Sequence, residues 1–227
     1  MTKVAAKLTG QSLGDKFAYH LVRGIVTVFC RTYCRMSIEG RENFPTDEPF
    51  IMAPTHRSII DTPVSSGAYT RRMRFMGADK WWSNPAFGKL LTALGGFPVT
   101  RGSADREALK RCIAVIEGGE PLVMFPEGER KSGPVVQPLF EGAAYIAMKT
   151  GAPIVPVGIG GSERVMPKGA KFIFPKKMHV VVGKPMRLEL PADATSKDQR
   201  AAARELTAAV QAELQRLFDL AQVKAGA

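Results

Sequence analysis

Residues 50–61 read Phe50-Ile51-Met52-Ala53-Pro54-Thr55-His56-Arg57-Ser58-Ile59-Ile60-Asp61. A short apolar run that ends at a proline is typical of a buried strand, and the polar residues after it belong to a turn. In open α/β sheets, ligands bind beyond the carboxyl ends of the strands. This stretch therefore predicts a buried strand with a functional site directly after it.

Strands and helices alternate on both sides of this stretch. Further apolar runs predict strands at 36–38, 73–76, 97–99, 122–125, 154–159, 172–174 and 179–182. Helical patterns lie between several of them, at Asn84-Pro85 and at 104–117. The alternation predicts a single α/β domain with a mixed, mostly parallel sheet flanked by helices. We expect the last two strands to form a hairpin around Lys176 and Lys177, which would make the sheet mixed.

The two ends of the chain differ from this α/β core, which we place at 37–195. Residues 1–36 contain an amphipathic helix, with Phe17, Leu21, Ile25 and Phe29 at helical spacing and with Arg23 and Arg31 on the other face. Such a helix lies in a membrane interface or docks on its own core, and its pattern favours neither. Residues 196–227 predict a C-terminal packing helix that begins with a capping box from Ser196 to Gln199.

The composition narrows the kind of partner. A net charge of +11 over 227 residues predicts an anionic partner, which is nucleic acid, anionic lipid or a phosphorylated small molecule. Three cysteines are too few for a disulfide framework. The longest early apolar run, at 24–30, is far shorter than the ~20 residues of a membrane-spanning helix. We therefore expect a chain that does not cross the bilayer. Trp81 and Trp82 are candidates for contact with a membrane interface, or one of them belongs to the core.

Three polar clusters each follow a predicted strand, and they contain His56 to Asp61, Thr100-Arg101 and Glu127 to Arg130. Residues five apart on a helix point ~140° away from each other, so His56 must lie in the turn before a helix, with Asp61 about one turn inside that helix. The carboxylate then accepts the imidazole Nδ1 proton and leaves Nε2 free as a base.

Several other chemistries lack their sequence motif. There is no G-x-S-x-G nucleophile elbow, no P-loop and no G-x-G-x-x-G, and the three histidines are too dispersed for a metal site. The proton that His56 removes is then expected to come from a hydroxyl of the substrate.

Four ordered segments resemble the conserved blocks of the glycerolipid acyltransferases, the family of 1-acylglycerol-3-phosphate acyltransferases. They are His56-Arg57-Ser58-Ile59-Ile60-Asp61, Gly95-Gly96-Phe97-Pro98-Val99-Thr100-Arg101, Phe125-Pro126-Glu127-Gly128 with Arg130, and Val155-Pro156-Val157. Their order and separation match the family over 50–159, roughly half of the chain. Thr55, Pro98, Thr100 and Glu129 depart from the family's usual residues, which leaves the choice of acceptor open.

The resemblance implies an acyltransferase-like fold and a direct transfer without an acyl-enzyme. His56, oriented by Asp61, would activate a glycerol hydroxyl of lysophosphatidic acid toward acyl-CoA or acyl-carrier protein. Arg101 and Arg130 would bind the acceptor phosphate, and Glu127 would bind a free hydroxyl or hold the arginines, next to Gly128. Backbone amides around Ser58 are candidate oxyanion donors. No cofactor and no metal are expected.

The implied partners are an acyl-thioester donor, a glycerol-phosphate lipid acceptor and an anionic membrane surface, with no nucleic acid. The resemblance places the protein as a peripheral or monotopic enzyme on the cytoplasmic face of the cell membrane. Glycerol 3-phosphate or another lysolipid is the alternative acceptor. A non-enzymatic protein that binds nucleic acid or an anionic membrane is the remote alternative, and it leaves His56, Asp61 and the Phe-Pro-Glu-Gly block unexplained. The oligomeric state stays open.

Overall fold

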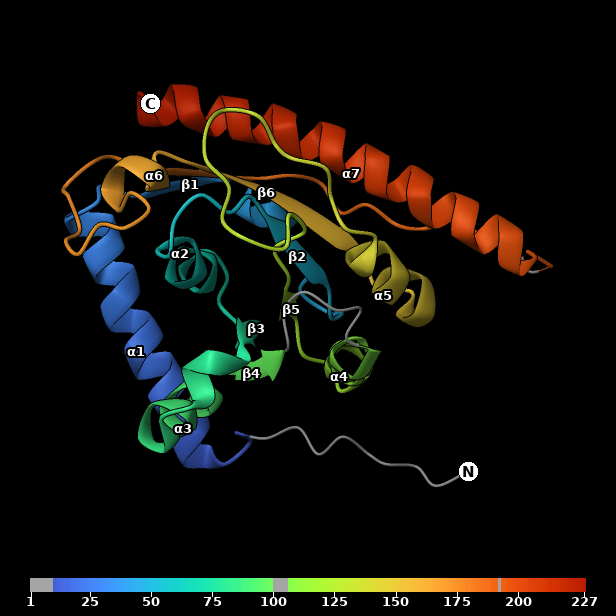
Figure 1. Ribbon diagram of the computed structural model, residues 1–227, viewed down its shortest axis with the longest axis horizontal. Helices are drawn as coiled ribbons and strands as arrows, with labels where there is room; N and C mark the ends of the chain where they lie inside the picture. The colour runs from blue at the N-terminus through green and yellow to red at the C-terminus, as the bar shows by residue number, and fades with distance from the viewer. Residues whose placement is uncertain (1–9, 100–105, 192) are drawn as a thin grey trace.

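The computed structural model describes residues 10–99, 106–191 and 193–227 (Figure 1). Within them, seven strands form one sheet in the order β1-β7-β6-β2-β5-β3-β4. Their bounds are β1 Ser37–Glu39, β2 Ile51–Pro54, β3 Arg74–Ala78, β4 Gly96–Val99, β5 Leu122–Val123, β6 Ile154–Gly160 and β7 His179–Val182. All neighbouring strands are parallel except β6 and β7, which run antiparallel. The prediction of a mixed, mostly parallel α/β sheet is confirmed.

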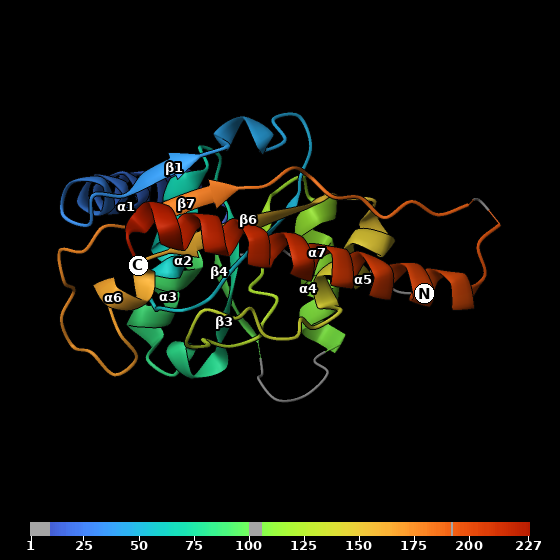
Figure 2. The ribbon, with the colours of Figure 1, turned by 90° about the horizontal axis from the view of Figure 1, so that it is seen from above.

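Helices cover both faces of the sheet (Figures 1 and 2). They are α1 Leu13–Thr32, α2 Asp61–Ala68, α3 Pro85–Ala93, α4 Arg106–Glu117, α5 Gly142–Thr150, α6 Ser162–Val165 and α7 Ser196–Ala225, with the short 3-10 turns η1 Arg41–Asn43 and η2 Asp79–Trp82. Alternate residues of β2 face the two sides of the sheet. Met52 packs in the core beneath α1 and α2, whereas Ile51 and Ala53 pack in the core beneath α4, α5 and α7. Because both faces are covered, β2 is apolar at every position rather than alternating.

The predicted hairpin around Lys176 and Lys177 is wrong. Residues 172–174 lie in a loop between α6 and β7, with the side chains of Phe172 and Phe174 exposed. The sheet is mixed because β7 pairs antiparallel with β6 and parallel with β1. An apolar run of three residues does not specify a strand unless another strand covers its backbone groups.

The helix ends follow local capping chemistry, with one shift of register. Asn84 caps α3 as predicted, because its side chain accepts from the backbone N–H groups of two residues in the first turn. The cap of α7 is Thr195 paired with Asp198, one residue before the predicted box. Both pairs have capping-box spacing, but the Asp198 carboxylate accepts from both the amide and the hydroxyl of Thr195.

The long helix α7 lies directly on β6 because two glycines remove the side chains between them. A Cβ atom on Gly158 would lie 2.4 Å from the backbone of Leu217, and one on Gly160 would lie 2.2 Å from the backbone of Ala221. The close contact brings Phe218 of α7 down to the polar turn that follows β2. No helix among the described residues combines the length and the apolar character that crossing a membrane requires.

Candidate active site

His56 and Asp61 lie together at the carboxyl end of β2. The imidazole Nδ1 lies 3.2 Å from Asp61 Oδ2, and the Asp61 side chain is fully buried. His56 sits in the turn after the strand, and α2 begins at Asp61 itself rather than a turn earlier. The contact therefore spans the junction from turn to helix, which is how residues five apart in sequence come to face each other.

The same carboxylate oxygen fixes the backbone of the turn. Asp61 Oδ2 accepts from the amide N–H of Arg57 at 2.7 Å and from that of Ser58 at 2.6 Å, in addition to its contact with His56. These bonds hold the turn in the shape that presents the imidazole. The other carboxylate oxygen, Oδ1, is buried without a hydrogen bond among the described residues.

The imidazole is held from two sides. Its ring stacks on Phe125, with ring centroids 3.9 Å apart and an interplanar angle of 19°. Asp61 occupies the Nδ1 side, so Nε2 is the nitrogen left for a substrate. Only 9% of the His56 side chain is accessible. Two packed neighbours and a small opening suit a base that must receive a proton from one direction.

Glu127 is buried beside His56 in an ion pair with Arg57. Arg57 Nη1 donates to Glu127 Oε2 at 2.6 Å, and the two side chains are 1% and 0% exposed. Oε2 also accepts from the amide of His56 at 3.2 Å, and Oε1 accepts from the amide of Gln137 at 3.0 Å. Both oxygens of Glu127 are therefore engaged by protein donors.

Arg57 links the turn to two other parts of the fold. Its guanidinium donates to the carbonyl oxygens of Gly133 at 3.1 Å and Val135 at 3.0 Å, and its Cζ lies 4.8 Å from the centre of the Phe218 ring. This role of Arg57 was not predicted from the sequence. The one signal available was that a glutamate inside an apolar block needs a counter-charge if it is buried.

The other residues of the first and third blocks have mainly structural contacts. The Ser58 amide binds Asp61 and its hydroxyl donates to the carbonyl of Met166 at 2.7 Å, so neither group is free for an oxyanion. Gly128 has φ +75°, and a Cβ atom there would lie 2.5 Å from the ring of Phe140. Arg130 is half-buried, and the residue after it donates its amide to the carbonyl of His56 at 2.9 Å.

Two further predictions concern the second block and a metal site. Arg101, with Thr100, falls outside the described residues. Within the described ranges, no cluster of three or more His, Cys, Asp or Glu side chains is arranged to hold a metal ion.

Helix α1 has one face on the protein and one face exposed. Tyr19 and Cys30 are buried, and Arg23 points inward to donate to the carbonyl of Ser66 at 2.9 Å. Arg23 is half-buried, because helical spacing places it on the same side of α1 as Tyr19 and Cys30. The exposed face carries the predicted residues Phe17, Leu21, Ile25 and Phe29, with Arg31 also exposed.

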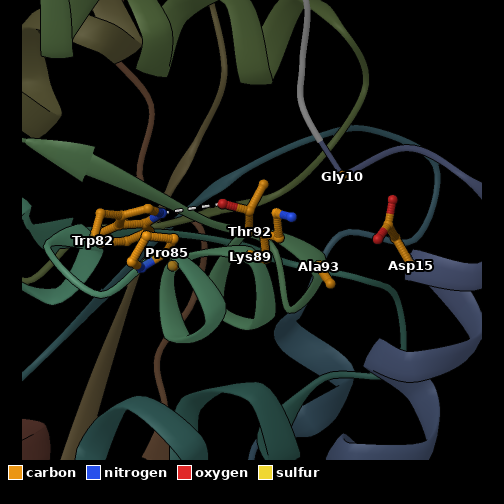
Figure 3. Close-up of a pocket in the computed structure, with 8 residues that line it drawn as sticks. Gly10, Asp15, Trp82, Pro85, Lys89, Thr92 and Ala93 are labelled. Atoms are coloured by element: carbon orange, nitrogen blue, oxygen red, sulfur yellow. Dashed lines mark hydrogen bonds between the residues drawn. The ribbon is translucent and has the colours of Figure 1, made fainter.

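The two tryptophans have different surroundings. Trp81 is exposed, whereas the indole of Trp82 donates to Thr92 Oγ1 at 3.1 Å (Figure 3) and lies over Gly77, Gly88 and Gly96. Trp82 thus packs on the fold. It lines a pocket of about 480 Å³ between α3 and the start of α1, which contains no residue of the His56 cluster.

A family model described as Acyltransferase matches residues 35–160, which is more than half of the chain and contains His56, Asp61, Arg57 and Glu127. The chain belongs to the acyltransferase family. The resemblance read from the four sequence blocks is therefore confirmed.

Named relatives agree with this family. A 1-acyl-sn-glycerol-3-phosphate acyltransferase from Bacillus subtilis is 31% identical over 172 residues, which cover 75% of this chain and 83% of the relative. A chloroplastic 1-acyl-sn-glycerol-3-phosphate acyltransferase from Brassica napus is 28% identical over 177 residues, and this acyltransferase spans about half of its length, at 51%.

A solved structure shows the same fold. The crystal structure of the 1-acyl-sn-glycerophosphate acyltransferase PlsC from Thermotoga maritima superimposes with a TM-score of 0.69, covering 91% of this chain and 84% of that one. Sequence identity between the two is 24%. The predicted acyltransferase-like α/β fold is confirmed.

Proposed function

We propose that this acyltransferase moves a fatty acyl group from an acyl thioester to a glycerol hydroxyl of lysophosphatidic acid. The observation that carries the proposal is the His56–Asp61 pair at the carboxyl end of β2, with Nδ1 held at 3.2 Å from the carboxylate. Glycerol 3-phosphate or another lysolipid is the alternative acceptor. The names of the relatives favour lysophosphatidic acid.

The reaction needs one proton to move twice. Nε2 of His56 accepts the proton of the acceptor hydroxyl while the oxygen of that hydroxyl attacks the thioester carbonyl. The Asp61 carboxylate stabilises the resulting imidazolium. The tetrahedral intermediate collapses, the C–S bond breaks and an ester C–O bond remains. The imidazolium then returns the proton to the thiolate of CoA or of acyl-carrier protein, so His56 ends the cycle neutral.

Acceptor binding calls for cations near His56. Of the two arginines predicted to bind the acceptor phosphate, Arg130 lies within the described residues. It is close to His56, because the amide of the adjacent Lys131 donates to the carbonyl of His56. A guanidinium can pair with a phosphate through two parallel hydrogen bonds. Arg101 keeps the role that the family resemblance implies for it.

Glu127 is proposed to position other residues rather than bind a substrate hydroxyl. Both of its oxygens already accept from protein donors, and a buried carboxylate in that state has little capacity for a further ligand. The arginine that it holds is Arg57 rather than the predicted Arg101 or Arg130.

A lipid acceptor requires a route to the bilayer. The exposed apolar face of α1 supports docking of this face on the cytoplasmic side of an anionic membrane. The remote alternative, a non-enzymatic protein for an anionic surface, explains this helix and the net charge of +11 but not the buried cluster around His56.

The test follows thiol release from palmitoyl-CoA or palmitoyl-acyl-carrier protein by detergent-solubilised protein. Lysophosphatidic acid, glycerol 3-phosphate or no acceptor is added in parallel. We expect release that needs lysophosphatidic acid and is lost in His56→Ala but kept in His20→Ala, an exposed histidine of α1. Release without acceptor would indicate a thioesterase, and no release with either donor would refute the proposal.

A further inference from the structure

The loop between α6 and β7 exposes aromatic and basic side chains together. This segment, residues 166–177, is named the lysine loop here. It contains Lys168, Lys171, Lys176 and Lys177 and no acidic residue. All four lysines are exposed, and none forms an ion pair with another described residue. Phe172 lies among them with 75% of its surface exposed.

The lysine loop is fastened to the C-terminal end of α1. The Tyr33 hydroxyl donates to the carbonyl of Ile173 at 3.1 Å, and Arg35 Nη2 donates to that of Pro175 at 3.2 Å. Figures 1 and 2 both place the loop, in orange, at the same outer edge of the molecule as α1, in blue. The loop therefore extends the exposed surface of α1.

The surface of α1 beside this loop is apolar. Leu13, Phe17, Leu21, Ile25 and Val28 recur along its outer face, and each is more than half exposed. One end of the surface is thus an apolar stripe, and the other end is a basic loop with exposed phenylalanines. This combination matches a bilayer, whose acyl chains take the apolar groups and whose anionic headgroups take the lysines. An acidic protein would match the lysines but leave the apolar stripe uncovered.

We propose that the lysine loop is a second membrane contact, which binds anionic headgroups and inserts Phe172 at the interface while α1 supplies the first contact. The inference rests on the proposed function, because it concerns the bilayer that would hold the acceptor. The loop begins at Met166, whose carbonyl accepts from the Ser58 hydroxyl at 2.7 Å. Docking by two points would therefore fix the His56 turn relative to the membrane plane, whereas α1 alone would allow the protein to rotate about the helix axis.

Vesicle flotation of the full chain without substrate tests the proposal. The variant K168Q/K171Q/K176Q/K177Q is compared with K110Q/K149Q/K184Q/K197Q, which removes the same charge from exposed lysines outside the loop. The vesicles contain phosphatidylcholine alone or mixed equally with phosphatidylglycerol. Each lysine near an anionic surface strengthens membrane partition roughly five-fold. If two of the four lysines reach the headgroups, the loop variant should therefore bind about 25-fold more weakly.

We expect this loss for the loop variant only, on anionic vesicles only, and diminished at ~1 M salt, where screening is over ~3 Å. F172A should weaken binding to both kinds of vesicle, unlike Y145A on α5. Equal losses in the two lysine variants would show that overall charge, not the loop, drives binding. Unchanged flotation of the loop variant, or no flotation of the unmodified protein, would overturn the proposal. Flotation without acyltransferase activity would uphold it while refuting the proposed function.

Discussion

Exchanging Glu127 for glutamine tests the buried ion pair beside His56. Among the described residues, the carboxylate accepts hydrogen bonds from the backbone amides of His56 and Gln137 and from the guanidinium of Arg57, the last at 2.6 Å. In either orientation, the glutamine amide points an N–H group at one of these donors. The variant also leaves the Arg57 charge unbalanced with 1% of its side chain exposed. Removing one member of a buried pair costs about 3–5 kcal/mol.

This cost is measurable as a change in thermal stability. In a domain of this size, each 1 kcal/mol lowers Tm by roughly 2–4 °C, so Glu127→Gln should lower Tm by about 6–20 °C. Tryptophan fluorescence of Trp81 and Trp82 reports unfolding. We also expect kcat to fall more than the KM for the acceptor rises, because the exchange disturbs the His56 backbone rather than a substrate contact.

Glu129→Gln is the matched control. Glu129 lies two residues away in the same loop, and its side chain is 65% exposed with an ion pair to Lys131 at 2.8 Å. An exposed pair contributes up to about 1 kcal/mol. A free energy of unfolding for Glu127→Gln within about 1 kcal/mol of that of the unmodified protein would refute a structural role for the ion pair. A higher acceptor KM at unchanged stability would refute it as well.

Three further changes have expected outcomes. Asp61→Asn should lower kcat by roughly 10²- to 10⁴-fold in the thiol-release assay, because the amide no longer orients His56 or stabilises its cation. Retained kcat would mean that the pair has no catalytic role. Gly160→Ala should cost about 3 kcal/mol or more in urea unfolding, because its Cβ atom would lie 2.2 Å from the backbone of Ala221, and an unaffected midpoint would contradict this packing. Burial raises the pKa of the Cys30 thiol from 9.0 to about 12. The unfolded thiol then ionises first, so the free energy of unfolding should fall as pH rises from 9 to 12. The fall should be smaller in Cys30→Ala, and an equal fall would assign it to other groups.

Local patterns in the sequence were sufficient for most of the fold. Apolar runs located the seven strands of the described residues to within about two positions, because a buried strand leaves a continuous apolar signature. The prediction that Asn84 caps a helix beginning at Pro85 is confirmed, because this cap depends only on two adjacent residues. The pairing of β7 was not predicted correctly, because strand pairing depends on where α6 and the lysine loop deliver the chain after β6, which no local pattern encodes.

For the site, the sequence determined the acyltransferase family and the local contact between His56 and Asp61, because that contact spans only five positions. The tertiary structure decided the partners from distant segments. Glu127 meets Arg57 across 70 positions, and Phe218 reaches the same guanidinium from the far end of the chain. The tertiary structure also decided which face of α1 is buried and which is exposed, because the same apolar stripe is compatible with contact to lipid and with contact to a protein core. Short-range contacts follow from backbone geometry, whereas long-range contacts exist only once the sheet has brought its strand ends together.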